Sequence, residues 1–357
     1  MLNSPQKFSI FQGIKKYRIR RVIFIALFWT IIDTLSTILN YDASQDHSKS
    51  ILTRAVLVFL MSAVMGYLFV YTLRNVFKNR PLLINFFAKT FILLFAALAM
   101  NFFAHLADNI FVEHLSFKKS MVDFYQYTIN GNWLLRRTLY WLIIFAVTQL
   151  YLEINDKYAP GVFLDILAGK YIKPRIENRI IMFIDLKDST PIAEKLGHQN
   201  YFLFIREFIY DLSLSLIEHN GIIYQYVGDE IVVSWKYNKE NMKNCLASII
   251  TGRKNIQRRS EHYRRIYNII PEFRIGIHLG DVTVGEIGVI KKDLAMSGDT
   301  MNTTARIRSA CNELNQKFIV SKDFAEKSSL KPFQLENLGI VELKGKANGI
   351  ELFALKI

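Results

Sequence analysis

The chain has 357 residues, of which 51% are apolar, and a formal net charge of +14. This length allows two domains, and the apolar content is high for a soluble protein. The positive charge does not indicate a nucleic-acid-binding protein, because much of it flanks apolar segments and no nucleic-acid motif accompanies the second basic run, 253–265. The two cysteines, Cys245 and Cys311, are too few and too far apart for a zinc site.

Four long apolar stretches lie in the first half of the chain, at about 22–40, 55–73, 82–104 and 139–154. They are roughly long enough to cross a bilayer, and they lack the polar face of a helix in a soluble core. Lysines and arginines precede the first stretch and separate the second from the third, whereas aspartates lie between the first two. We therefore expect a multi-pass protein of the cell membrane, embedded in lipid, with its N-terminus and C-terminal half in the cytoplasm.

Two ionisable residues fall within these stretches: Asp33 in the first and His105 near the end of the third. Such groups are costly inside a membrane and are usually paired or functional. We expect them to help pack the helices or to sense a signal. The alternatives are a water-facing Asp33 and a His105 at the membrane interface.

The segment after the last apolar stretch contains two helix breaks, at Pro160–Gly161 and at Lys173–Pro174. A short amphipathic segment, 162–167, lies between them and is either a coupling element or a passive tether. The predicted domains are a four-span transmembrane domain at 1–154, a linker at 155–178 and a catalytic domain at 179–357.

The order of elements from Arg179 onward is strand, helix, two strands, helix, strand. This order predicts an α+β, ferredoxin-like domain with a mainly antiparallel sheet and helices on one face. The expected elements are a strand ending at Asp185, a helix through 202–216, a hairpin around Asp229, a helix at about 241–264, strands at 273–280 and 282–288, a helix at about 300–311, and strands at 317–321, 340–345 and 350–356.

Two strand ends carry aspartates. The apolar run Ile180–Ile184 stops at Asp185, and Asp188 follows in a polar turn that opens a helix. Backbone N–H groups in such a turn can hold phosphates, and Asp188 can accept some of them itself. Asp229 follows Gly228 at the tip of the hairpin. Either aspartate alone is more typical of a cap or turn, but together they predict a metal site for phosphoryl transfer.

A third motif, SGDTMNTTARIRSAC, lies in the predicted helix at 300–311. Asn302 and Arg306 are four residues apart and share one face of that helix. The planar guanidinium of Arg306 suits phosphate oxygens, and Asn302 is a neutral donor or acceptor. The alternatives are a helix-start polar residue and a surface charge. Arg308 falls on a different face, and we expect it to be exposed to solvent.

The three motifs together, in this order and spacing, resemble the catalytic domain of the class III nucleotidyl cyclases, the adenylate/guanylate cyclase family. The resemblance covers 179–357, about half of the chain. The apolar N-terminal half and the lead-in GKYIKPRIENRI are similar to membrane-anchored bacterial members.

The resemblance implies a head-to-tail homodimer with active sites at the interface. Two divalent cations, Mg²⁺ or Mn²⁺, would bind Asp185, Asp229 and the carbonyl of Leu186. Asn302 of the second chain would orient the ribose, and Arg306 of that chain would stabilise charge at the α-phosphate. The implied nucleotide-binding residues are the turn Leu186, Lys187, Asp188, Ser189 and Thr190, the base-facing Gln225 and Ala295, and Lys344 at the terminal phosphates.

The positions that choose the purine depart from the family pattern. Adenylate cyclases typically carry Lys where this chain has Gln225, and Asp or Thr where it has Ala295. Guanylate cyclases have Glu and a small residue such as Cys or Ser there. The Gln225 amide offers both a donor and an acceptor. We favour ATP as the substrate, with GTP as the alternative. A silent nucleotide-binding membrane receptor is a further alternative, disfavoured because all four motif residues are retained.

Overall fold

The computed structural model describes residues 12–40, 48–73, 82–130, 133–157, 165–166, 168–290, 292–328, 330–343, 346 and 348–357. The chain divides into two compact units, Lys15–Lys157 and, together with the first residues, Tyr158–Ile357. The division into domains at 1–154, 155–178 and 179–357 stays a prediction. The proposed coupling segment 162–167 lies outside the described residues except for Asp165 and Ile166.

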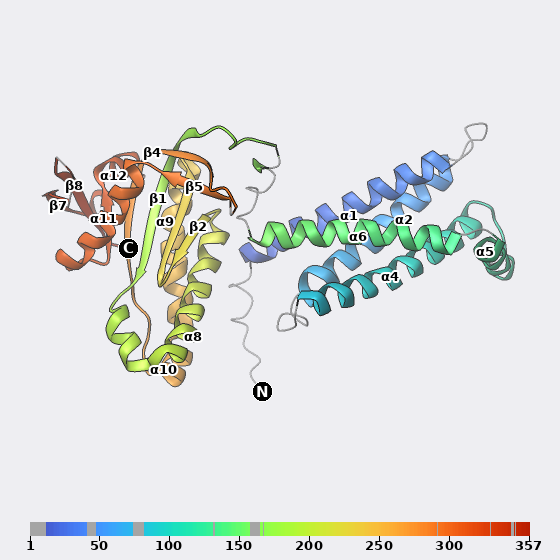
Figure 1. Ribbon diagram of the computed structural model, residues 1–357, viewed down its shortest axis with the longest axis horizontal. Coiled ribbons are helices and arrows are strands. Elements are labelled where there is room, and N and C mark those ends of the chain that lie inside the picture. The colour runs from blue at the N-terminus through green and yellow to red at the C-terminus, as the bar shows by residue number, and fades with distance from the viewer. Residues whose placement is uncertain are drawn as a thin grey trace. The chain divides into compact units, whose positions relative to one another are not determined.

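The first unit is a bundle of long helices with α5 at one end (Figure 1). Its elements are α1 (Gln12–Asn40), α2 (Ser48–Tyr67), the π-helical η2 (Leu68–Leu73), α4 (Leu82–Phe111), α5 (Phe117–Asn130) and α6 (Trp133–Lys157). Phe91 and Phe95 on the outside of α4 are more than 70% exposed, while Leu93 on the same helix is buried. A helix that is apolar on all sides is typical of a membrane span.

Three helical segments of the described residues are long and apolar enough to cross a membrane: Arg18–Leu39, Ile51–Tyr71 and Phe86–Phe111. They suggest a membrane anchor. The fourth predicted stretch forms part of α6, which is not among these segments, so a fourth span stays a prediction. The charged loops 41–47 and 74–81 lie outside the described residues, so the predicted orientation also stays a prediction.

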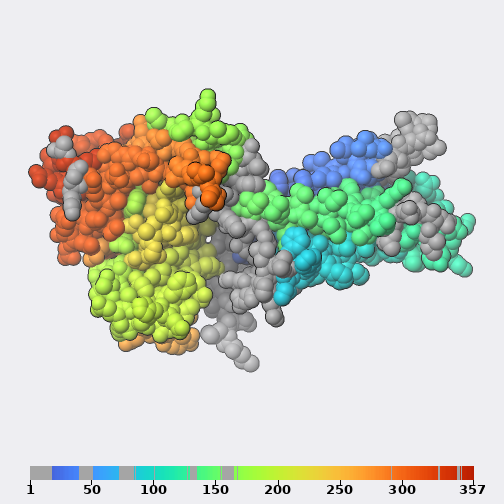
Figure 2. All heavy atoms as spheres, viewed as in Figure 1, coloured from blue at the N-terminus to red at the C-terminus, as the bar shows by residue number. Residues whose placement is uncertain are grey.

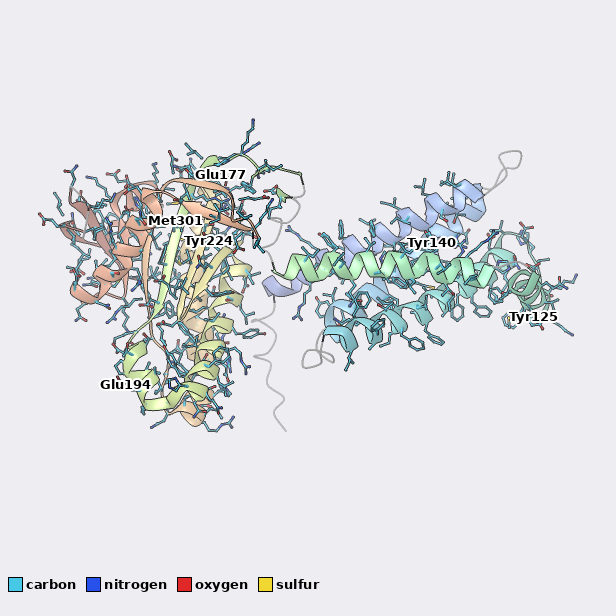
Figure 3. All side chains as sticks on the ribbon, in the orientation of Figure 1. Tyr125, Tyr140, Glu177, Glu194, Tyr224 and Met301 are labelled. Carbon is cyan, nitrogen blue, oxygen red and sulfur yellow. The ribbon has the colours of Figure 1, made fainter. Side chains whose placement is uncertain are left out.

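A buried polar cluster joins the four long helices of this unit. Asp33 on α1 is 1% exposed, and its carboxylate accepts hydrogen bonds from Arg54 on α2 at 2.8 and 3.1 Å. The Arg54 guanidinium also donates to Asn101 on α4 at 3.0 Å. Arg137 on α6 lies 3.5 Å from Asp33 and stacks over Tyr140, which Figure 3 labels. Asp33 therefore does not face water, and its contacts support a role in packing.

His105 is paired as well. Its Nε2 lies 3.0 Å from a carboxylate oxygen of Asp123 on α5, and Asn109 donates to the same oxygen. His105 and Asp123 are partly exposed. This pair ties α5 to α4.

The second unit is built on one mixed sheet with strand order β2-β3-β1-β4-β6-β8-β7, and β5 pairs with β4. All pairs are antiparallel except β4 and β6. The strands are β1 (Arg175–Leu186), β2 (Ile222–Val227), β3 (Glu230–Lys236), β4 (Phe273–Ile287), β5 (Asp293–Ser297), β6 (Phe318–Ser321), β7 (Leu335–Val341) and β8 (Ile350–Leu355). The helices are α8 (Ser189–Glu218), α9 (Lys239–Arg258), α10 (Ser260–Tyr267), α11 (Asp299–Glu313), α12 (Lys322–Lys327) and the short 3-10 helix η3 (Pro332–Gln334).

Alternating side chains of β1 build two cores. Ile180, Met182 and Ile184 pack with α8, α9, α10 and α12, whereas Ile181 and Phe183 pack on the opposite face, where α11 contributes Met301. Figure 2 draws the heavy atoms of these elements as spheres and shows one face of the unit, while the two cores lie inside it. The α+β fold is as predicted, but the expectation of helices on one face only is wrong, because α11 covers the second face.

Three predicted element bounds are also wrong. The strand expected at 340–345 is β7, which begins at Leu335 and ends at Val341. The strands expected at 273–280 and 282–288 form one continuous strand, β4, because a single residue, Asp281, separates two apolar runs without turning the chain. The helix expected at 241–264 is two helices, since α9 ends at Arg258 and α10 begins at Ser260.

Candidate active site

Asp185 lies one residue before the end of β1, and its side chain is 19% exposed. The alternation of the strand places it on the face of Ile181 and Phe183, which is the face that α11 covers. The antiparallel register pairs Ile184 with Ile231 on β3, so Asp185 lies opposite the start of β3. The sheet thus presents this carboxylate toward the β2–β3 hairpin and α11.

Asp229 sits in the tight turn of that hairpin. Gly228 before it has φ 61°, a left-handed conformation that favours glycine. One carboxylate oxygen of Asp229, Oδ2, is buried and has no hydrogen-bond partner among the described residues. Burial, reinforced by the charge of Asp229, raises the pKa of Asp185 to about 6, although Arg308 acts in the opposite direction. The strand register places Asp185 opposite Glu230, the residue after Asp229, so the two aspartates lie beside each other.

The expectation that Arg308, on α11, faces solvent is wrong. Its Nη1 lies 3.2 Å from Oδ2 of Asp185, and its Nη2 lies 2.7 Å from Oε2 of Glu230. This contact is possible because α11 packs closely against β4: a Cβ on Gly276 of β4 would lie 2.4 Å from the backbone nitrogen of Arg308. Sequence reasoning missed both Arg308 and Glu230. The feature of the sequence that could have indicated this contact is Gly276, a glycine within a strand at a position that a helix approaches closely.

Asn302 and Arg306 point away from this cluster. Successive residues of an α-helix turn by about 100°, so Arg306 and Asn302 point roughly 160° and 120° away from Arg308. Asn302 is exposed and Arg306 half-buried, and neither side chain has a hydrogen bond or ion pair within the described part of the chain. The structure therefore does not bring these two residues to Asp185 of the same chain.

The turn after β1 has open backbone donors. Leu186 is buried, and the backbone N–H of Lys187 donates a hydrogen bond of 2.9 Å to the carbonyl oxygen of Glu272. Asp188 adopts a left-handed conformation (φ 58°) before α8, and its side chain makes no capping hydrogen bond. The expectation that Asp188 accepts backbone N–H groups is therefore wrong, because capping carboxylates need an extended backbone at this position. Ser189 and Thr190 begin α8, whose first N–H groups lack a side-chain cap.

The two residues expected to face the base lie on β2 and β5. Gln225 is exposed and follows a bulge at Tyr224, and Ala295 pairs with Gly285 of β4. The Tyr224 hydroxyl accepts a hydrogen bond from the backbone N–H of Met296 at 3.1 Å. Figure 3 labels Tyr224 and Met301, which share the second core with Met296. Sequence reasoning did not identify Tyr224.

Lys344 lies outside the described residues. Nearby, the ammonium group of Lys346 pairs with the carboxylate of Asp299 at the start of α11. This ion pair ties the segment after β7 to the helix that carries Asn302 and Arg306.

Residues 172–356 match the adenylate and guanylate cyclase catalytic domain. The chain belongs to this family. Adenylate cyclase 2 of Rhizobium meliloti is 30% identical over 206 residues, which are 57% of this chain and 57% of that protein. The receptor-type guanylate cyclase gcy-10 of Caenorhabditis elegans is 24% identical over 54% of this chain and 18% of its own. This chain thus spans 57% or less of these curated relatives. A solved bacterial light-regulated adenylyl cyclase shares the fold, with a TM-score of 0.54 and 18% identity over 64% of this chain and 67% of its own.

The donors of this cyclase domain fit a hard divalent cation. Mg²⁺ and Mn²⁺ bind through one or two carboxylates together with substrate phosphates, and Asp185 and Asp229 provide such a pair. The unpartnered Oδ2 of Asp229 is a buried acceptor that a cation would satisfy. Within the described residues there is no group of three or more His, Cys, Asp or Glu side chains arranged to hold a metal ion. The remaining ligands would therefore come from backbone and substrate oxygens.

Proposed function

We propose that this cyclase is a membrane-anchored adenylate cyclase that converts ATP to cyclic AMP and pyrophosphate. The convergence of Asp185 with the buried, unpartnered carboxylate oxygen of Asp229 is the observation that carries the proposal. Two carboxylates this close repel each other when both are ionised, and Arg308 offsets the charge of Asp185 only, so a divalent cation is the group that would satisfy both. The similarity to Adenylate cyclase 2 of Rhizobium meliloti supports ATP as the substrate.

In the proposed reaction, the ribose 3′-oxygen forms a bond to the α-phosphorus of the same ATP molecule. The bond from the α-phosphorus to the oxygen shared with the β-phosphorus breaks, pyrophosphate leaves, and the hydroxyl proton is lost to water. Two divalent cations held by Asp185, Asp229 and the Leu186 carbonyl would neutralise phosphate charge and acidify the 3′-hydroxyl. The backbone N–H groups of the turn Leu186–Thr190, apart from that of Lys187, which donates to Glu272, would hold the triphosphate, since α8 begins at Ser189 without a side-chain cap.

The site is completed by a second copy of the chain. Asn302 and Arg306 lie on the face of α11 turned away from Asp185, yet their side chains have no partner within the described residues. In a homodimer, Asn302 of one chain orients the ribose bound to the other. Arg306 of that same chain stabilises the charge that develops on the α-phosphate. Lys344 holds the terminal phosphates.

Base recognition falls to Gln225 and Ala295. The Gln225 amide can donate to the N1 acceptor of adenine and accept from its amino group, whereas Ala295 offers only its backbone. The three helical segments that are long and apolar enough to cross a membrane, with α6 as the proposed fourth span, would embed the first unit in the lipid of the cell membrane. In the proposed arrangement, four spans leave the N-terminus and the catalytic domain in the cytoplasm, where ATP is available.

The test uses the full chain in lipid nanodiscs, incubated with MnCl₂ and either ATP or GTP, with the cyclic product identified by mass spectrometry. Cyclic AMP should form from ATP and should be lost in Asp185→Asn. Asp323→Asn, a matched change on the exposed side of α12, should remain active. Formation of cyclic GMP alone would contradict the choice of ATP, and nucleotide binding without any product would contradict the enzymatic function.

A further inference from the structure

Arg308 occupies a place in the acidic cluster that the proposed mechanism does not use. Its guanidinium lies between Asp185 at 3.2 Å and Glu230 at 2.7 Å, and the three side chains are only 13 to 24% exposed. One of the two contacts is thus to an oxygen of a proposed metal ligand. A guanidinium is always protonated, so this contact places a permanent positive charge where a cation would bind.

The ion pairs leave Arg308 incompletely satisfied. Its Nε is buried and has no hydrogen-bond partner among the described residues. A guanidinium with a purely structural role in a buried site is expected to use all sides of its donor fork. Its terminal nitrogens alone contact the two carboxylates, through a hydrogen bond to Asp185 and an ion pair with Glu230, whose Oε2 accepts no hydrogen bond among the described residues. Such an arrangement can shift from one carboxylate to the other.

The charges of the cluster show what such a shift would do. Asp185, Asp229 and Glu230 carry three negative charges when ionised, and Arg308 supplies one positive charge. The guanidinium therefore reduces the attraction of the empty site for a divalent cation, while Glu230 provides a second carboxylate on which it can remain once Asp185 is taken.

We propose that Arg308 is a built-in counter-cation that competes with a free divalent cation for Oδ2 of Asp185 and retreats onto Glu230 when the cation arrives with the nucleotide. This inference rests on the proposed metal site at Asp185 and Asp229. Arg308 acts through Asp185 and is thus a positioning residue. As a consequence, the enzyme without nucleotide binds free cations weakly. The metal site is filled when the nucleotide binds together with its cation.

The test measures binding of Mn²⁺ alone to the full-length protein in phosphatidylcholine nanodiscs, from the electron paramagnetic resonance signal of free Mn²⁺. Arg308→Met should tighten Mn²⁺ binding by about tenfold or more, because one repelling charge is removed at contact distance. Glu230→Gln should weaken binding, because it removes an attracting charge and leaves Arg308 on Asp185 alone. The double variant should lie between the two, and Arg308→Lys should stay closer to the wild type than Arg308→Met does.

Arg265→Met is the matched control, since it removes an exposed positive charge on α10 and should leave the affinity unchanged. Weaker or unchanged Mn²⁺ binding in Arg308→Met would overturn the inference, provided that Asp185→Asn abolishes binding. If Asp185→Asn binds Mn²⁺ normally, the proposed metal site itself fails. Should Arg308→Met not fold, Glu230→Gln decides alone: weaker binding supports the inference, and unchanged or tighter binding overturns it.

Discussion

The hydroxyl of Tyr224 on β2 accepts a hydrogen bond of 3.1 Å from the backbone N–H of Met296 on β5. Each of these residues is the direct neighbour of a proposed base-facing residue, Gln225 and Ala295. The bond thus fixes the separation of the two strands that would hold the purine. A side chain that never touches the base can therefore influence which base is accepted.

Tyr224→Phe should loosen purine discrimination. Removing one hydrogen bond of this kind should change the ratio of kcat/KM for ATP over GTP by about two- to tenfold. Steady-state assays of the full chain with each nucleotide measure this ratio. Tyr210→Phe removes an exposed hydroxyl on α8 and should leave the ratio as it is. A loss of overall activity with an unchanged ratio would show that Tyr224 only supports the fold.

Asp229→Asn should abolish cyclase activity and yet stabilise the cation-free protein. The amide removes a negative charge beside Asp185 and can donate a hydrogen bond to it, which relieves the repulsion of two buried carboxylates. We expect a rise in Tm without cations and no further rise on adding MnCl₂, whereas the wild type should gain stability with MnCl₂. Differential scanning fluorimetry of the purified chain measures both. A lower Tm without cations would argue that the aspartates do not repel each other.

The sequence allowed both aspartates to be located, because each ends an apolar strand run and strand ends are local features. Asp185 does end the buried part of β1, and Asp229 does lie in the β2–β3 turn. The α+β fold followed from the same local order of elements.

The contact of Arg308 with Asp185 could not be predicted in this way. It depends on which face of the sheet α11 covers, and that choice is made by residues far apart in the chain, such as Gly276 beneath the helix. The expectation that helices lie on one face assigned α11 to the wrong layer, and Arg308 was therefore assigned to solvent. Tyr224 could not be identified for a related reason. The bulge at Tyr224 interrupts the alternation of inward and outward side chains from which strand residues are assigned to a face.

Binding of Mn²⁺ should depend on pH through Asp185. Burial and the neighbouring Asp229 raise the pKa of Asp185 from 3.8 to about 6, so a cation must displace a proton below that pH. We expect Mn²⁺ affinity to be about tenfold weaker at about pH 5 than at about pH 7 and to level off above. Titration of the full chain at several pH values measures this. An affinity that is constant across this range would contradict the raised pKa.

The raised pKa of Asp185 also affects the stability of the cation-free protein. Low pH weakens Mn²⁺ binding, but it favours the folded state. Because the folded pKa lies above the ordinary value of 3.8, the folded protein binds this proton more tightly than the unfolded chain does. The contribution of Asp185 to stability is therefore present at low pH and is lost as the pH rises from about 4 to about 6. Asp185→Asn should lack this component of the pH dependence of Tm.

Asp33→Asn should destabilise the first unit. Asp33 is the buried partner of Arg54 and lies near Arg137, so its neutralisation leaves buried positive charge without compensation, at a cost of about 3 to 5 kcal/mol. Thermal stability of the detergent-solubilised chain, followed by size-exclusion chromatography, should fall. Arg54→Met combined with Asp33→Asn should recover part of the loss, because the unpaired charge is then removed. Unchanged stability, membrane expression and cyclase activity in Asp33→Asn would contradict a packing role for the cluster.

The central claim is that one active site uses Asp185 of one chain and Arg306 of another. The most direct test co-expresses two variants that should each be inactive alone, Asp185→Asn and Arg306→Ala. A mixed dimer contains one site with both wild-type residues, so random pairing should restore about a quarter of the wild-type activity. Cyclic AMP production near that level is the predicted result. No activity in the mixture, with mixed dimers shown by co-purification of two differently tagged chains, would contradict the shared site.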